Sequence, residues 1–337
     1  MPETAPAVLH GVPDLAVPFP LRVNLGLDAV RGRDMAWAKA TGLVSSPADE
    51  RRYRSWDLAL LVAGWLPDAP ADGLDVAANA FNWCTVYDDL HAGDKSTDVR
   101  HARTLQRPLL DYLATGTLAA SPSPLLLALH DIVTRERQRA PREAHPRITH
   151  DWSLFIAAFL EETGNRKAGQ PLAFTEYRAL RRRSGAVNLM LDLIEIAGGY
   201  HTTPRARSVP VFQELLDSAN DAICFINDLY SHVKEEAAGD PHNLVFVVQN
   251  ERRCPRAQAI ERAAEITLDA CDDVLLRQSR LRAACRQAGL SPREAASAQR
   301  FAFELAYPIS SMASWQRQSA RYWQPDNTLY GSGQAGS

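Results

Sequence analysis

Three oxygen-bearing side chains, Asn227, Ser231 and Glu235, recur at intervals of four residues. On an α-helix, side chains at this spacing lie close to one face. An amide oxygen, a hydroxyl and a carboxylate are hard ligands of the kind that Mg²⁺ prefers, with water and phosphate oxygens completing its shell. Lys234 adds a cation that could reach a phosphate. Taken alone, the stretch is as typical of a solvated helix end as of a metal site.

A second acidic feature, Asp88-Asp89, ends an apolar stretch that begins at Phe81. Adjacent carboxylates at the end of a buried helix repel each other and are costly to desolvate. They also oppose the helix dipole, which makes the alternative of a plain polar helix end less favourable. Together with the Asn227 stretch, the pair predicts a site for a metal-bound diphosphate.

Composition excludes several classes of protein. The chain has 337 residues and a formal net charge of -3, which argues against a general nucleic-acid binder. Its five cysteines form no CxxC pair, so we expect neither a disulfide framework nor a zinc site, and a reducing, cytoplasmic location. Residues 1–20 lack a basic start followed by an apolar run, and no apolar run reaches about 18 residues, so we expect neither a signal peptide nor a membrane span.

Apolar residues recur at three- and four-residue steps through most of the chain, which predicts helices. The predicted helices are 36–41, 55–65, 76–91, 124–139, 150–163, 175–196, 210–236, 255–288 and 292–317. We expect a kink or split at Pro308, and loops at Pro67, Pro108, Pro141 and Gly289. No alternation of period two predicts a sheet, and no repeat or linker divides the chain. The pattern therefore indicates one all-α domain.

With these motifs the chain resembles the bacterial class I terpene synthases (terpene cyclases), from about residue 17 to residue 323. Asp88-Asp89 stands where that family has its aspartate-rich motif. Asn227, Ser231 and Glu235 match the family's second metal motif, N-D-x-x-S-x-x-x-E. The second match is the more specific of the two.

Further positions of the resemblance carry the diphosphate contacts. Arg181, 46 residues before Asn227, stands where the family has a diphosphate-sensing arginine, and Ser184 and Gly185 fall at its linker and effector positions at a helix break. Arg321-Tyr322 resembles the pair that closes over the diphosphate.

The resemblance implies a helical bundle around a central cavity over residues 17–323, after a flexible segment 1–16 and before a disordered tail 324–337. It implies three Mg²⁺ ions, held by Asp88 and Asp89 on one side and by the Asn227 motif on the other. Because the family's first aspartate carries most of the metal coordination, we expect Asp88 to be sufficient. The implied reaction ionises an allylic prenyl diphosphate and yields a terpene hydrocarbon or alcohol, usually cyclic. Farnesyl diphosphate is the first candidate substrate and geranyl diphosphate the second. A homodimer is left open.

The leaving diphosphate needs cations where its charge develops, and Arg181, Lys234, Arg321 and Tyr322 are the expected donors. The carbocation needs a dry wall, on which each aromatic face contributes ~0.5–2 kcal/mol. Candidates are Phe81, Trp83, Tyr87, Trp152, Phe155 and Trp315. Each could instead be an ordinary core residue. Phe81 and Trp315 are preferred because they lie near the motifs.

One departure from the family stands out: its first motif often carries a further acid where this chain has Ala92. We hypothesise weaker metal affinity or a less complete closure of the site. A chain-elongating prenyltransferase is the nearest alternative, but those enzymes carry two aspartate-rich motifs. A non-catalytic helical binding protein is the alternative of another class, and it leaves both acidic sites and Arg181 unexplained.

Overall fold

The computed structural model describes residues 11–169 and 171–322, and within these ranges all regular structure is helical, with no strand. The all-α prediction is confirmed. The predicted tail 324–337 lies outside the described residues, as do residues 1–10 of the expected N-terminal segment. Of that segment, Val12 and Leu15 are described, and both are buried in the core.

The described helices follow one another with short connections. They are α1 (Leu27–Ala40), α2 (Pro47–Trp56), α3 (Leu58–Trp65), α4 (Ala71–Asp89), η1 (Gly93–Lys95), α5 (Val99–Thr115), α6 (Pro124–Arg139), η2 (Arg142–Ala144), α7 (His145–Ala168), α8 (Phe174–Ser184), α9 (Val187–Gly198), α10 (Pro204–Arg207), α11 (Pro210–Ala238), α12 (Leu244–Arg252), α13 (Arg256–Gln287), α14 (Pro292–Glu304) and α15 (Ala306–Gln316).

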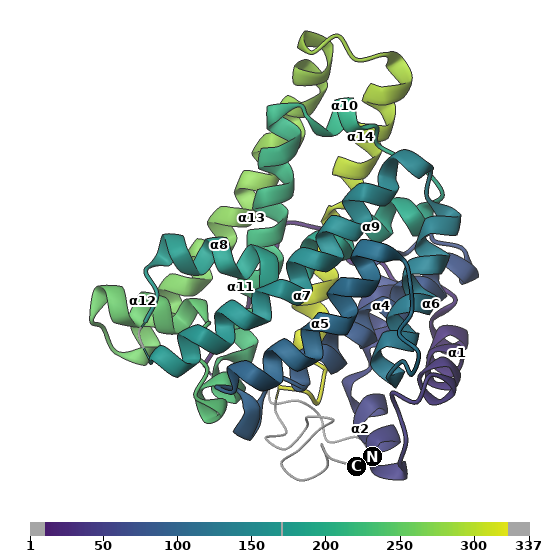
Figure 1. Ribbon diagram of the computed structural model, residues 1–337. Coiled ribbons are helices and arrows are strands. Elements are labelled where there is room, and N and C mark those ends of the chain that lie inside the picture. Colours follow the sequence, from purple (N-terminus) through teal and green to yellow (C-terminus); the bar gives the residue numbers. More distant parts are fainter. Residues whose placement is uncertain (1–10, 170, 323–337) are drawn as a thin grey trace.

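The helices form a bundle in which α11 and α13 run side by side over much of their length (Figure 1). Helix α11 also packs on α15, α15 on α3, and α4 on α9, so that segments far apart in the sequence meet around the centre. Buried apolar side chains from nearly all of these helices join in one cluster. The helices therefore share one hydrophobic core.

The predicted helix 55–65 is wrong as a single element, because α2 ends and α3 begins at Asp57, whose φ is 47°. The indole of Trp315 donates to the carbonyls of Trp56, at 2.9 Å, and Asp57, at 3.0 Å. A distant side chain therefore satisfies backbone groups that the break leaves open.

One expectation about proline holds with a shift in position, and another is wrong. The expected split of 292–317 is present, but it falls at Leu305, three residues before Pro308, since the proline ring would clash with the carbonyl of Glu304. Pro308 itself lies in the first turn of α15, where its missing N–H is not needed. Pro108 lies inside α5 and not in a loop. Helix α5 buries Leu109, Tyr112 and Leu113 and packs along α7. This tertiary packing overrides the local preference of proline.

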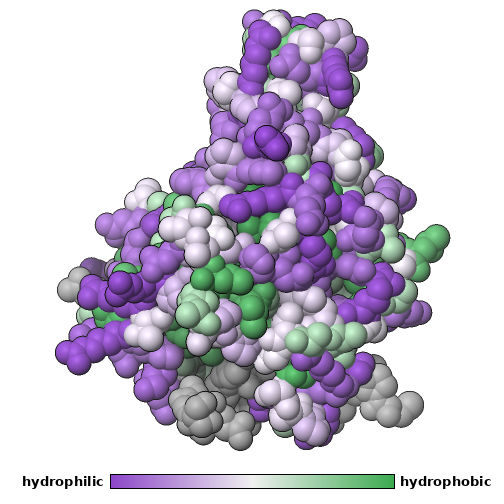
Figure 2. Space-filling view, turned by 45° about the vertical axis from the view of Figure 1, so that its right-hand side comes forward, coloured by the Kyte–Doolittle hydropathy of each residue, from purple (hydrophilic) through white to green (hydrophobic). Residues whose placement is uncertain are grey.

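No helix among the described residues is long and apolar enough to cross a membrane. The face shown in Figure 2 is mostly hydrophilic, above all over the narrow upper part near α10 and the start of α14. The five cysteines are unpaired, as the sequence predicts.

Candidate active site

A cavity of about 160 Å³ lies within the bundle and is lined from α3, α4, α7, α8, α9, α11 and α15. The predicted site residues among its lining are Phe81, Asp88, Arg181, Ser184, Gly185, Asn227, Lys234, Glu235, Trp315, Arg321 and Tyr322. Of the predicted set, Asp89 and Ser231 are not part of the lining.

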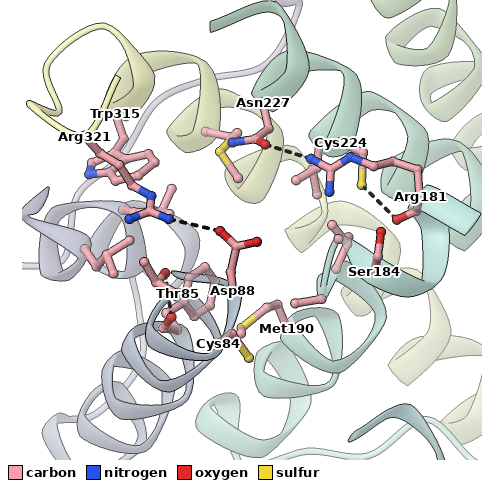
Figure 3. Close-up of a pocket in the computed structure, with 18 of the residues that line it drawn as sticks. Cys84, Thr85, Asp88, Arg181, Ser184, Met190, Cys224, Asn227, Trp315 and Arg321 are labelled. Carbon is pink, nitrogen blue, oxygen red and sulfur yellow. Dashed lines mark hydrogen bonds and ion pairs between the residues drawn. The ribbon is translucent and has the colours of Figure 1, made fainter. Parts of the chain in front are cut away.

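The two adjacent aspartates at the end of α4 differ in their surroundings. Asp88 points into the cavity (Figure 3), its side chain is 53% exposed, and Oδ2 accepts a hydrogen bond from Nη2 of Arg321 at 3.1 Å. Asp89 is buried, and both of its oxygens accept from Arg321, at 2.7 and 3.1 Å. Its Oδ1 also lies 3.8 Å from Nζ of Lys234. Asp88 is therefore the carboxylate accessible to a metal ion, and Asp89 anchors the cations beside it.

Helix α11 presents Asn227 and Glu235 to the cavity, with Ser231 buried between them. Ser231 and Glu235 share a partner, Asn243, which caps α12 through its side-chain oxygen. Nδ2 of Asn243 donates to Oε2 of Glu235 at 2.7 Å and lies 3.4 Å from Oγ of Ser231. Asn243 was not predicted as a site residue, although an asparagine before the apolar run 244–248 is a helix-start signal.

The donor set fits a hard divalent cation. Asp88 faces Asn227 across the cavity (Figure 3), and carboxylate and amide oxygens are ligands of this class. Burial, and then the neighbouring carboxylate of Asp240, raise the pKa of Glu235, as expected for a carboxylate whose charge needs a cation. Groups of three or more His, Cys, Asp and Glu suited to a metal are absent from the described residues, and the set here mixes these acids with Asn and Ser.

Arg181 is held against α11 by two neighbouring residues. Its Nη2 donates to Oδ1 of Asn227 at 2.7 Å, and its Nε donates to Oδ1 of Asp228 at 3.0 Å. Asp228 is fully buried and also accepts from the hydroxyl of Tyr177 and from the backbone N–H of Leu244. No role for Asp228 was predicted, although a charged residue on the buried side of an amphipathic helix was a usable signal.

The predicted helix 175–196 is wrong as one element, because it breaks into α8 and α9 at Gly185 and Ala186. A Cβ on Gly185 would lie 2.5 Å from Sγ of Cys224 and 2.9 Å from the carbonyl oxygen of Arg181, so only glycine fits. Ala186 has a φ of 60°, which is unfavourable for an alanine. The hydroxyl of Ser184 is buried without a hydrogen-bond partner among the described residues. The helix break thus brings a strained backbone and an unused donor to the cavity.

The C-terminal pair Arg321-Tyr322 closes one side of the cavity. The hydroxyl of Tyr322 accepts from Nδ2 of Asn227 at 3.0 Å, and the ring of Tyr322 meets that of Trp315 edge-on, with centroids 5.6 Å apart. The guanidinium of Arg321 also lies over the ring of Trp56, 4.9 Å from its centroid.

The aromatic candidates separate into two groups. Phe81, Phe155 and Trp315 line the cavity, and Trp65, which was not predicted, joins them by packing edge-on against Phe81. Trp83, Tyr87 and Trp152 do not line it. They lie in the core, where their polar atoms bond to Leu125, Ile156 and Glu136.

Residues 79–273 match the family model for terpene synthase family 2, C-terminal metal binding. The chain is 34% identical to (+)-T-muurolol synthase of Roseiflexus castenholzii over 75% of this chain and 77% of the relative. It is 27% identical to 7-epi-alpha-eudesmol synthase of Streptomyces viridochromogenes over 91% and 90%. The crystal structure of a-eudesmol synthase superimposes with a TM-score of 0.80 at 26% identity, covering 89% of this chain and 97% of that one.

The all-helical bundle and the match to the metal-binding domain define a synthase of the terpenoid class. The chain belongs to the bacterial class I terpene synthases, and is therefore an enzyme with a metal-binding domain.

Proposed function

We propose that this enzyme is a Mg²⁺-dependent terpene synthase that ionises farnesyl diphosphate, releases diphosphate and converts the carbocation to a terpene hydrocarbon or alcohol. The observation that carries the proposal is the placement of Asp88 opposite Asn227 and Glu235, at one end of a cavity whose remaining wall is largely apolar. This arrangement has a polar end for the diphosphate and an apolar end for an isoprenoid chain.

The residues for the ionisation step are the cations at the polar end. Magnesium ions held by Asp88 and by Asn227, Ser231 and Glu235 would neutralise the charge of the leaving diphosphate. Arg181 and Arg321 would donate their paired N–H groups to its oxygens, a geometry that suits guanidinium better than ammonium. Lys234 and Tyr322 supply further donors.

After ionisation, the wall must exclude water and tolerate positive charge. Phe81, Phe155 and Trp315 present aromatic rings, and Met190 and Met312 present polarisable thioethers. No histidine is among the described lining residues, so we expect the released diphosphate to accept the final proton. The backbone break at Gly185 and the hydroxyl of Ser184 line the cavity and would face the cation.

The choice of farnesyl diphosphate rests on the relatives. Both curated relatives described above are named as cyclising (2E,6E)-farnesyl diphosphate. The proposed reaction is cytoplasmic, in keeping with five unpaired cysteines.

The test is incubation of the protein with geranyl, farnesyl and geranylgeranyl diphosphates, each with and without Mg²⁺, followed by identification of the volatile products. We expect Mg²⁺-dependent release of diphosphate and a terpene from farnesyl diphosphate. Turnover of geranyl diphosphate alone would replace the proposed substrate. A longer diphosphate formed with isopentenyl diphosphate would indicate a prenyltransferase, and no diphosphate release from any chain length would contradict the enzymatic proposal.

A further inference from the structure

A small side pocket adjoins the cavity where α4 and α11 end. It has a volume of about 60 Å³, and Asp88, Lys234 and Glu235 line both the pocket and the main cavity. Ala92 and Arg166 line the pocket but not the cavity. A group bound in the side pocket would therefore lie beside both metal motifs.

Arg166, in the last turn of α7, connects the two segments that follow these motifs. Its Nε donates to the carbonyl oxygen of Ser96 at 2.9 Å, and its Nη1 donates to Oδ2 of Asp240 at 2.6 Å. Ser96 comes shortly after the Asp88-Asp89 pair, and Asp240 comes shortly after Glu235. The guanidinium thus lines the same pocket as Ala92. Ala92 is the residue that stands where the family often has a further acid.

The remaining nitrogen of this guanidinium is unused. Nη2 of Arg166 is buried and has no hydrogen-bond partner among the described residues, and the side chain is only 5% exposed. The nearest acids pair with another nitrogen of the same guanidinium: Glu162 lies 3.5 Å from Nη1 and Asp240 accepts from Nη1, and Asp240 also bonds to His242. A buried charged donor without an acceptor is destabilising, so a ligand that supplies an oxygen there gains affinity.

Charge and size indicate what that ligand is. Lys234 brings a second cation to the pocket, and guanidinium and ammonium groups together suit the oxygens of a phosphate. The carboxylates of Asp88, Glu235 and Asp240 also line the pocket, so a phosphate would bind there together with the metal ions of the proposed function. About 10–15 Å³ of cavity holds one water, so about 60 Å³ has room for the few heavy atoms of a phosphate group.

We propose that Arg166 and Lys234 form a phosphate subsite in the side pocket and bind one phosphate group of the substrate's diphosphate. This inference rests on the proposed function, because it extends the same diphosphate site. In this chain the first metal motif has no distal acid, and the inference assigns Arg166 the role of a fixed cation beside that motif. Inorganic diphosphate and orthophosphate offer the same chemistry as the substrate.

The first test is calorimetric binding of inorganic diphosphate at saturating Mg²⁺. Arg166→Lys keeps the charge but loses the free Nη2, and we expect diphosphate to bind roughly 10-fold more weakly. The control Lys167→Gln removes a charge from the exposed neighbouring residue and should bind like the wild type. Equal affinity in Arg166→Lys and the wild type would overturn the proposal.

The second test leaves the existing bonds of Arg166 in place, and so avoids a folding defect. Ala92→Asp adds an acceptor to the side pocket, which we expect to pair with Nη2 and to weaken diphosphate binding roughly 10-fold while raising the melting temperature. If the added acid instead served as a metal ligand, diphosphate would bind more tightly. An unchanged or increased affinity would therefore overturn the proposal.

A final pair of measurements separates the sources of the phosphate. Arg166→Lys should also weaken binding of farnesyl thiolodiphosphate, an unreactive substrate analogue. A loss confined to inorganic diphosphate or orthophosphate would overturn the assignment to substrate. A wild-type protein that binds no diphosphate with Mg²⁺ would contradict the proposed function itself, whereas tight wild-type binding with no effect in Arg166→Lys would contradict only this inference.

Discussion

Arg181 donates Nη2 to Oδ1 of Asn227 at 2.7 Å, which is the atom of Asn227 that a metal ion would use. Arg321 has a similar relation to Oδ2 of Asp88. A metal ion at either oxygen displaces the guanidinium from it, so metal binding is expected to free one N–H donor of each arginine for the diphosphate, while Asp228 and Asp89 still hold the two side chains in place. The two ligands should then bind cooperatively.

This cooperativity is measurable as a thermodynamic cycle. We expect Mg²⁺ to tighten the binding of inorganic diphosphate at least ~10-fold, and diphosphate to tighten the binding of Mg²⁺ by the same factor. Asn227→Ala and Glu235→Ala should reduce this factor and lower kcat/KM at least ~100-fold, with melting temperatures close to that of the wild type. Full activity in either variant would contradict the metal assignment.

Asp228 should act as a positioning residue for Arg181. Asp228→Asn leaves a buried guanidinium without its carboxylate, and we expect the free energy of unfolding in urea to fall by about 3–5 kcal/mol. Asp217→Asn is the matched control, because this carboxylate pairs with Arg182 but is 57% exposed, and its loss should cost less than about 1 kcal/mol. Similar losses in both variants would rule out the anchoring role.

Gly185 should tolerate no side chain. Gly185→Ala forces Sγ of Cys224 and the carbonyl of Arg181 to move, so we expect kcat to fall at least ~10-fold. Adding Cys224→Ala relieves only the contact with sulfur and should restore part of the activity. Gly164→Ala, within α7 and with open space around it, is the control and should be neutral or stabilising by up to ~1 kcal/mol. Wild-type kinetics in Gly185→Ala would refute the close-contact argument.

Phe81 and Trp83 are close in sequence, but their substitution should affect different properties of the enzyme. Phe81→Leu changes the cavity wall, so we expect an altered product mixture with little change in melting temperature. Trp83→Leu removes a fully buried indole and should destabilise the protein by about 3 kcal/mol without redirecting the products. Gas chromatography of products beside thermal denaturation separates the effects, and the reverse pattern would show that the wall is misassigned.

Glu136 should make stability depend on pH. Burial raises the pKa of Glu136 to about 8 from its ordinary value of 4.5, so the folded state holds a proton that the unfolded state has lost. The contribution of Glu136 to the free energy of unfolding should therefore be highest below about pH 4.5. Between there and about pH 8 this contribution should fall by at most ~1.4 kcal/mol per pH unit. Glu136→Gln should flatten this slope, and the exposed Glu161→Gln should leave it unchanged.

Local signals predicted helix α6 with both of its ends, because a serine cap and a proline open it and a proline follows it. They failed where a distant residue decides the local structure. The break at Asp57 depends on the indole of Trp315, more than two hundred residues away. The continuation of α5 through Pro108 depends on its packing along α7.

For the site, spacing along one helix predicted that Asn227 and Glu235 share a face, the resemblance added Arg181 and Gly185, and all four line the cavity. Spacing alone could not say which of Asp88 and Asp89 faces the cavity, whereas the resemblance favoured Asp88, and Asp88 is the one that lines it. Arg321, from the far end of the sequence, occupies both oxygens of Asp89 and bonds to only one oxygen of Asp88. The side pocket could not be predicted from the sequence, because its walls come from α4, α7 and α11, which are distant in the chain.

Arg321 lies 232 positions after Asp89 and bonds to both carboxylates at the end of α4. During synthesis, Asp88 and Asp89 lack this counter-charge until residue 321 has left the ribosome. The polar end of the cavity is therefore assembled only after residue 321 has emerged. Nascent chains should gain diphosphate affinity only beyond this point, and a product terminated before Arg321 should fold most of its helices yet remain inert.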